Sequence, residues 1–200
     1  NDEGLGLIPT KLDFKKPFHI DFLVKQLNYR AQHLTMELLI KATGLSKNPQ
    51  QKVLDTTAGV GTDAYLMASA GAKVTMLERH RIMYVLLCDA LARLQHKKSI
   101  DISLYNQDAS KYIENHGSQF DIIYLDPMYM PRQKKVRALK SMEILKALVG
   151  PDEDYQALLE VALAQKNKRI VIKRPYDDNP IIKPSYSYAA KDTRFDVYRT

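Results

Sequence analysis

The sequence predicts an α/β protein with a mostly parallel sheet covered by helices on both faces. Three observations support this. The 200 residues suit one compact domain. Strand-like and helix-like segments alternate four times after residue 52, and the strand segments are short and apolar. Such alternation is typical of parallel strands joined by crossover helices.

The expected elements follow in order. Strands are expected at residues 52–56, 72–78, 101–108, 120–126 and 169–174. Helices are expected at about 31–43, from Thr62, around 83–94, and at 110–116, 136–148 and 154–167. The alternating tail, 185–190 and 194–199, predicts two strands of a hairpin. We therefore expect a lead-in segment and helix over 1–45, packed on a domain over 46–200.

The composition limits the function classes. A net charge of +7 fits a polyanionic partner such as nucleic acid, and equally a merely basic protein. No apolar run reaches the roughly 18 residues of a membrane span, and the sequence, which opens at Asn1, shows no signal-peptide pattern. Cys88 is the single cysteine, which excludes an internal disulfide and a multi-cysteine zinc site. We expect Cys88 to be buried in a helix, no metal site, and a cytoplasmic location.

In open α/β sheets, ligands bind at the carboxyl ends of the strands, so the residues at these ends are the first candidates. The first strand ends at Asp55 and enters a turn with Gly59 and Gly61, which lets backbone approach a ligand closely. The next helix begins near Thr62 and Asp63, whose side chains we expect to cap its N–H groups. The helix N-terminus favours a carboxylate or phosphate.

Two more acidic residues end the second and third strands. Glu78 could accept hydrogen bonds from both hydroxyls of a ribose, or it could cap the helix that starts near His80. Asp108 could accept a bond from an adenine amino group, or it could cap its own following helix. Both alternatives stay open for each residue on sequence alone.

The fourth strand ends in "DPMY". Asp126 should enter the same crevice, Pro127 fixes a turn without an N–H, and Tyr129 offers a planar ring. A nucleobase amine is a poor nucleophile because its lone pair is delocalised. Acceptors for both of its N–H groups, together with a stacking ring, would activate and hold it. The sequence therefore predicts catalytic roles for Asp126, Pro127 and Tyr129.

A basic run follows this turn. "RQKKVRALK" could contact RNA phosphates, although a solvated helix face is the alternative. The candidate RNA-binding residues, which include two on the fifth strand, are Arg132, Lys134, Lys135, Arg137, Lys173 and Arg174.

Several motifs resemble one family. "DTTAGVGTDA", "MLER", "YLDPMYMPRQK", "LVGPD", "VIKRP" and "RFDVY" are similar to segments of the bacterial small-subunit rRNA guanine-N2 methyltransferase J family. The similarity runs from about residue 50 to the C-terminus, and more loosely back through the lead-in segment. It implies a Rossmann-like class I fold with a seven-stranded sheet and a C-terminal antiparallel hairpin. It also implies S-adenosylmethionine as cofactor, and as partner 16S rRNA or the small ribosomal subunit, with a guanosine near the 3′ end of 16S rRNA as target.

The resemblance also implies specific contacts. Cofactor contacts would fall on Thr62, Asp63, Glu78, Arg79, Asp108, Ala109 and Asp126. Two positions depart from the pattern. Thr57 stands where the first glycine of the cofactor loop is usual, and "LNYRAQHLT" lacks the family's glycine run, so substrate contacts from that stretch stay open.

Two other functions fit part of the sequence. "GVGTDA" also matches the G-x-G-x-x-A loop of an NAD(P)-dependent oxidoreductase. Hydride transfer, however, gives no reason for an acid-Pro-Met-aromatic strand end. A non-catalytic RNA-binding protein is the second alternative, and the intact Glu78 and Asp126 argue against it.

Overall fold

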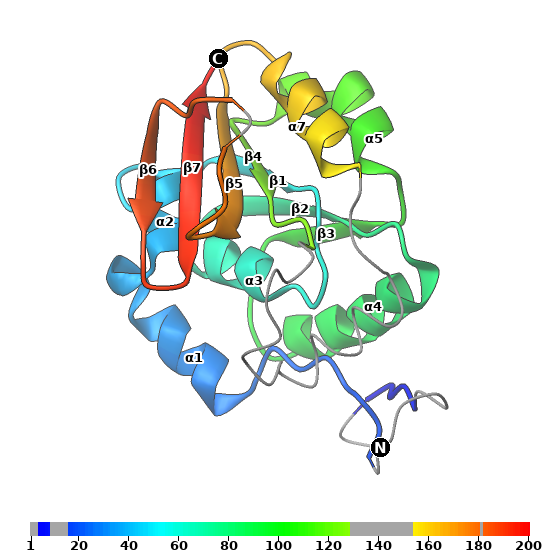
Figure 1. Ribbon diagram of the computed structural model, residues 1–200. Helices are drawn as coiled ribbons and strands as arrows, with labels where there is room; N and C mark the ends of the chain where they lie inside the picture. The colour runs from blue at the N-terminus through cyan, green and yellow to red at the C-terminus, as the bar shows by residue number, and fades with distance from the viewer. Residues whose placement is uncertain (1–3, 9–15, 129–153, 181) are drawn as a thin grey trace.

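A seven-stranded sheet forms the centre of the computed structural model, which describes residues 4–8, 16–128, 154–180 and 182–200. Its strands are β1 (Lys52–Asp55), β2 (Lys73–Leu77), β3 (Ile102–Tyr105), β4 (Ile122–Leu125), β5 (Arg169–Pro175), β6 (Tyr186–Ala189) and β7 (Thr193–Arg199). The order is β3-β2-β1-β4-β5-β7-β6. Strands β1 to β5 are parallel, and β7 runs antiparallel to both β5 and β6 (Figure 1). The expected mostly parallel sheet and terminal hairpin are confirmed.

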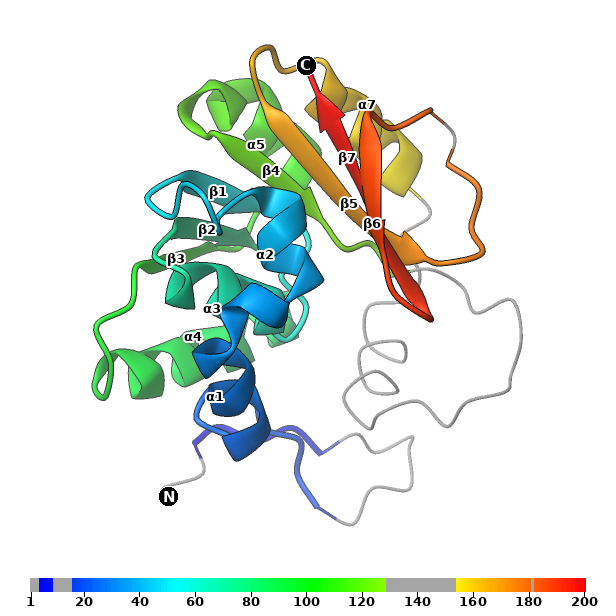
Figure 2. The ribbon, with the colours of Figure 1, turned by 90° about the vertical axis from the view of Figure 1, so that its left-hand side faces the viewer.

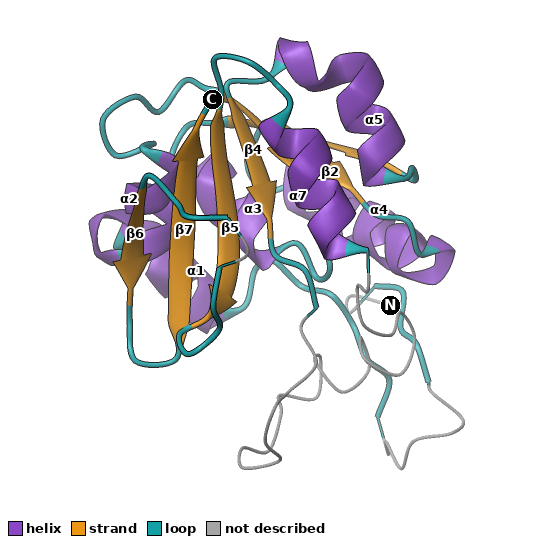
Figure 3. Cartoon of the chain, turned by 45° about the horizontal axis from the view of Figure 1, so that its top comes forward, coloured by secondary structure: helices purple, strands orange, loops and turns teal. Residues whose placement is uncertain are grey.

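Helices cover both faces of the sheet. They are α1 (Lys25–Gln32), α2 (Leu38–Thr43), α3 (Thr62–Ser69), α4 (Arg81–Gln95), α5 (Ala109–His116) and α7 (Tyr155–Leu163). Figures 2 and 3 show α1 to α4 on one face and α5 and α7 on the other. Successive strand residues point to opposite faces, so Val53 joins the buried cluster under α2 to α4 while Leu54 joins the one under α5 and α7. The expected helix at 136–148 lies outside the described residues.

The N-terminal region differs from the expectation of one helix over about 31–43, which was wrong. Helix α1 begins at Lys25, a short 3-10 turn covers Leu34–Met36, and α2 starts at Leu38. Arg30 and Glu37 brace the break with two hydrogen bonds of 2.7 and 2.8 Å. The end of α2 was predicted correctly, because Gly44 adopts φ 79° there.

Part of the expected lead-in packs on the core. Ile20, Phe22 and Leu27 are buried in the same cluster as α3, and the Phe22 ring stacks on Tyr65 at 5.7 Å. The division into 1–45 and 46–200 stays a prediction.

Helix α4 shows where periodicity succeeds and fails. Its predicted apolar face is buried, with Met83, Leu87 and Leu94 inaccessible to solvent. Cys88 is exposed, so its expected burial was wrong. Helical spacing explains this, because Cys88 follows Leu87 by about 100° and so turns away from the buried stripe. Among the residues that the structure describes, no helix is both long and apolar enough to cross a membrane.

Candidate active site

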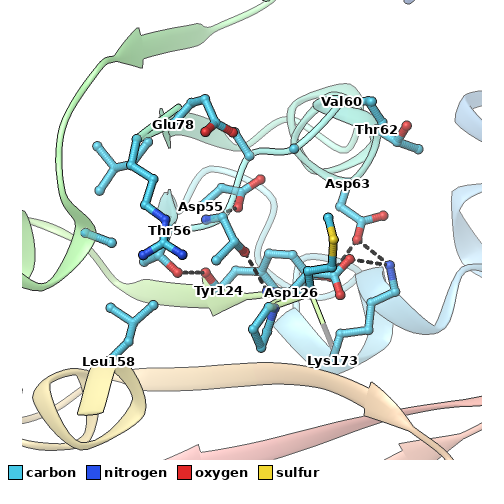
Figure 4. Close-up of a pocket in the computed structure, with 18 of the residues that line it drawn as sticks. Asp55, Thr56, Val60, Thr62, Asp63, Glu78, Tyr124, Asp126, Leu158 and Lys173 are labelled. Atoms are coloured by element: carbon cyan, nitrogen blue, oxygen red, sulfur yellow. Dashed lines mark hydrogen bonds and ion pairs between the residues drawn. The ribbon is translucent and has the colours of Figure 1, made fainter. Parts of the chain in front are cut away.

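A cavity of about 520 Å³ opens at the carboxyl ends of the parallel strands. Residues from the ends of β1, β2, β4 and β5, and from the start of α5, line it together (Figure 4). We call it the strand-end cavity. The predicted cofactor residues that line it are Asp55, Gly59, Thr62, Asp63, Glu78, Arg79, Asp108, Ala109 and Asp126. The structure therefore gathers side chains that lie far apart in the sequence into one site, as a parallel sheet dictates.

The glycine turn between β1 and α3 forms one wall. Gly59 and Gly61 have φ values of 55° and 76°, in the left-handed region that favours glycine. A Cβ on Gly61 would lie 2.7 Å from the Phe22 ring. Gly61 is absent from the residues that line the cavity, and its role is close packing behind the turn. Thr62 and Asp63 do not cap α3 with their side chains, so that expectation was wrong.

Asp63 instead belongs to a charged network on the cavity floor. It accepts hydrogen bonds from the Tyr124 hydroxyl at 2.6 Å and from Lys173 Nζ at 2.9 Å. Lys173 Nζ also donates to Asp126 Oδ2 at 2.7 Å. Figure 4 shows this ammonium between the two carboxylates. One lysine thus joins α3, β5 and the turn after β4.

The network shifts the ionisation of its members. Burial acts to raise the pKa of Asp63, but the Lys173 charge and hydrogen bonds from Tyr124 and Lys173 outweigh it, leaving the pKa below its ordinary value. Burial acts to lower the pKa of Lys173, but attraction by Asp126 and Asp63 outweighs it and raises the pKa. Burial and the nearby carboxylates raise the pKa of Tyr124. Lys173 and Asp63 are therefore charged at neutral pH, and Tyr124 is neutral.

Asp55 behaves differently, because no ion pair among the described residues reaches it. It is 1% exposed and accepts a hydrogen bond from the Thr57 N–H at 3.1 Å. Burial raises its pKa to about 8, against the effect of this hydrogen bond. Asp55 is therefore mainly protonated at neutral pH.

The "DPMY" turn is tied to the loop after β1. The backbone N–H of Asp126 donates to Thr57 Oγ1 at 2.6 Å, and the Thr56 hydroxyl donates to the Tyr124 carbonyl at 2.9 Å. Pro127 is buried and Met128 partly buried, and both line the cavity. Tyr129 lies outside the described residues, and its stacking role stays a prediction.

Glu78 and Asp108 each contact the start of the helix that follows, which was one of the two alternatives for each residue. Glu78 is 6% exposed and accepts a 2.7 Å hydrogen bond from the His80 N–H at the start of α4. Asp108 caps α5 by accepting from the Lys111 N–H at 3.1 Å. Both residues also line the cavity, so these helix contacts do not exclude a role in ligand binding. Their ribose and adenine contacts stay predictions.

The proposed RNA-binding residues divide into two groups. Arg132, Lys134, Lys135 and Arg137 lie outside the described residues. The Arg174 side chain is 1% exposed and pairs with Asp178 at 2.6 Å, although it also lines the strand-end cavity. Its RNA contact stays a prediction. Lys173 is committed to the two carboxylates of the cavity floor.

Sequence reasoning also missed cavity residues. Tyr124 was given no role in the predicted strand, although strand alternation places it on the same face as Asp126, two residues later. Arg30, Leu158, Asp192 and Thr193 line the cavity as well, from α1, α7 and the β6–β7 turn region. Their sequence surroundings carry no signal, because only the fold brings them to this edge.

Together, the strand order and an acid-lined cavity with a glycine turn after β1 define a Rossmann-like S-adenosylmethionine-dependent methyltransferase. A family model described as "Putative SAM-dependent methyltransferase" matches residues 1–200. The chain belongs to this family, in which its curated relatives are named ribosomal RNA small subunit methyltransferase J. Its cofactor is accordingly S-adenosylmethionine.

Two relatives and one solved structure illustrate the likeness. The relative from Coxiella burnetii is 40% identical over 189 residues, covering 91% of this chain and 74% of its own length. That from Thioalkalivibrio sulfidiphilus is 36% identical over 208 residues, covering 98% and 82%. The crystal structure of a SAM-dependent methyltransferase from Neisseria gonorrhoeae aligns with a TM-score of 0.71 at 30% identity, covering 94% of this chain and 76% of that one. These likenesses favour neither the oxidoreductase nor the non-catalytic alternative.

Proposed function

We propose that the chain transfers a methyl group from S-adenosylmethionine to the exocyclic N2 of a guanosine in small-subunit rRNA. The observation that carries this proposal is the place of Asp126. It follows β4 directly, is fixed by Thr57 and Lys173, and shares one cavity with Glu78. The names of the relatives support the rRNA substrate. With that substrate, the protein acts in the cytoplasm, on 16S rRNA or on the small ribosomal subunit.

The residues present fit the cofactor. Glu78 presents a buried carboxylate at the end of β2, where a ribose can donate both hydroxyls. The glycine turn brings backbone to the cavity wall, and Asp108 stands at the start of α5, where an adenine amino group can donate. Asp63 and Asp126 add negative charge to the floor, which suits a ligand with a sulfonium and an ammonium.

Asp126 and the turn at Pro127 would supply the acceptors for the target amine. The bound cofactor supplies an electrophilic methyl group. Asp126 and a backbone carbonyl of the turn accept hydrogen bonds from the two N–H groups of N2, and Tyr129 stacks on the base. As N2 attacks that methyl group and displaces the thioether, Asp126 would stabilise the positive charge that develops on the nitrogen. The nitrogen then sheds a proton to Asp126, so no stronger base is needed. Positioning and charge stabilisation provide much of the acceleration.

The target base must leave any stack to bring its N2 edge against Asp126 in the strand-end cavity. A loop nucleotide or a flipped base is therefore the expected substrate. The basic run at residues 132–140 would hold the flanking phosphates.

Methylation of defined RNA tests this proposal. Purified protein is incubated with labelled S-adenosylmethionine and either naked 16S rRNA or assembled small subunits from a strain that lacks the gene, and the nucleosides are then identified by mass spectrometry. We expect label in N2-methylguanosine with at least one substrate. Label on adenine, or none with either substrate, would overturn the proposal. Calorimetry with S-adenosylmethionine and with NAD distinguishes the oxidoreductase alternative, since only the first should bind.

A further inference from the structure

Lys173 sits where three elements of the site meet. The parallel register pairs Leu125 of β4 with Ile172 of β5, so the next residues, Asp126 and Lys173, lie on adjoining strands. Lys173 Nζ contacts Asp126 Oδ2 at 2.7 Å and Asp63 Oδ2 at 2.9 Å. The ammonium thus links the catalytic turn to the first turn of α3.

This lysine is anchored more firmly than a surface lysine. Its strand is paired on both sides, with β4 and with β7, and its side chain is 28% exposed. Asp63 is held from a second direction by the Tyr124 hydroxyl. Asp126 is held through its backbone N–H by Thr57. The ammonium therefore meets two carboxylates whose positions are already fixed, which gives a charge-assisted contact with little loss of freedom.

Among the residues that the structure describes, charged and titratable groups near Asp126 come from four elements. Asp63 on α3 is negative, Tyr124 on β4 is neutral, and Asp55 on β1 is mainly protonated below pH about 8. Lys173 on β5 is positive. Without this cation, Asp63 and Asp126 would face each other as like charges, which disfavours the ionised form of both.

A further cation stands near the network but cannot replace Lys173. Arg30 of α1 lines the cavity and interacts electrostatically with Asp63 and Tyr124. Its guanidinium, however, is occupied by two hydrogen bonds to Glu37.

We propose that Lys173 is a positioning residue of methyl transfer, which keeps the Asp126 carboxylate charged and oriented toward the target amine. The inference rests on the proposed function. An ionised carboxylate can accept a hydrogen bond from the amine and then take up its proton. The protonated oxygen of a neutral carboxyl group can do neither. Lys173 itself remains protonated throughout, so it acts through Asp126 and not as a base.

Three substitutions separate charge from packing. Lys173→Met removes the ammonium and keeps the stem. Lys173→Gln retains two N–H donors without the charge and serves if the Met variant does not fold. Lys173→Arg keeps the charge. Lys73→Met, at the start of β2 and outside the cavity, is the matched control. Folding is checked by circular dichroism and thermal melting.

The first readout does not need methyl transfer. Carboxyl ¹³C NMR of the cofactor-free protein follows the titration of Asp126, assigned with Asp126→Asn. We expect the midpoint to rise by about one pH unit or more in the Met and Gln variants, and to stay near wild type in the Arg variant. An unchanged midpoint in the Met or Gln variant would overturn the proposal.

The second readout is the pH profile of kcat on RNA. We expect the loss of kcat in the Met variant to be largest at the lowest pH, where the raised Asp126 midpoint leaves less of the carboxylate charged, and to shrink as pH rises, while KM for the RNA changes little. An equal loss at every pH would indicate a structural role and reject the proposal. If wild-type protein transfers no methyl to RNA, the proposed function fails, and the NMR titration still decides the role of Lys173.

Discussion

The backbone N–H of Asp126 donates a 2.6 Å hydrogen bond to the Thr57 hydroxyl, which joins the turn after β4 to the loop after β1. Thr57 occupies the position where the first glycine of such a cofactor loop is usual. Here the hydroxyl fixes the backbone that carries Asp126, the proposed catalytic residue, which glycine cannot do. The departure from the pattern thus has a structural use.

Thr57→Val tests this link, because it removes the hydroxyl and keeps the shape. The Asp126 N–H then loses its acceptor, and we expect the free energy of unfolding to fall by about 1–3 kcal/mol. Turnover should fall as well, since the turn is less fixed. Urea unfolding measures the first effect. Thr75→Val on β2, outside the cavity, makes the same chemical change and should leave turnover intact. A Thr57 variant with wild-type stability and turnover would show that the link is dispensable.

Glu78 has an observed helix contact and a proposed cofactor contact, which one substitution can separate. Glu78→Gln keeps an oxygen that can accept from the His80 N–H, but it loses the charge and one acceptor. We expect nearly normal stability and a loss of about 1.5–3 kcal/mol in cofactor affinity, measured by calorimetry. Glu78→Ala should lose stability in addition, because the α4 N-terminus loses its cap. Wild-type affinity in the Gln variant would mean that Glu78 serves only the helix.

Asp55 predicts a pH dependence of stability in the cofactor-free protein. Its pKa in the folded state is about 8, above the ordinary value of 3.8. A carboxyl group whose pKa is raised by folding holds its proton more tightly in the folded state. The free energy of unfolding is therefore highest below the unfolded-state pKa and falls as pH rises toward 8. Asp55→Asn removes the titration and keeps an oxygen for the Thr57 N–H. We expect the variant to gain stability relative to wild type as pH rises from 5 to 8, by at most about 1.4 kcal/mol per pH unit. Parallel stability curves for the two proteins would refute the assignment.

Much of this site could be predicted because parallel strands impose it. Asp55 ends β1, whereas Glu78, Asp108 and Asp126 follow β2, β3 and β4, and the carboxyl ends of parallel strands share one edge. Placing these residues in one cavity required only the position of each strand in the sequence and no knowledge of the contacts between them.

The contacts within the site were beyond the sequence for a different reason. Lys173 was expected to contact RNA because nothing local shows which side of β5 it faces or that Asp63 lies opposite. Arg174 looked equally exposed, yet it pairs with Asp178 in the interior. Helix α1 was missed because its sequence "KQLNYRAQ" has one buried residue, Leu27, and so shows almost no apolar stripe. Tertiary pairing decided each case.

RNA binding by the basic run at residues 132–140 remains a prediction. Lys134 and Lys135 are expected to bind RNA phosphates. Replacing both with alanine should reduce the log-log salt slope of RNA binding by about 0.7–0.9 for each phosphate that the variant no longer neutralises. Filter binding across a salt series measures the slope. The control pair is Lys47 and Lys166, both exposed and outside the cavity, each preceding a strand. An unchanged slope in the Lys134/Lys135 variant would favour the solvated-face alternative.

The most direct measurement is the single-turnover rate of Asp126→Ala at saturating cofactor and RNA. Asp126 accepts from the target amine in the proposed chemistry, so its loss should slow methyl transfer by about 10²-fold or more. Asp101→Ala changes an exposed aspartate just before β3 and should transfer at the wild-type rate. Circular dichroism should show that both variants fold. A rate for Asp126→Ala within a few-fold of wild type would contradict the assignment of Asp126 as the acceptor for the target amine.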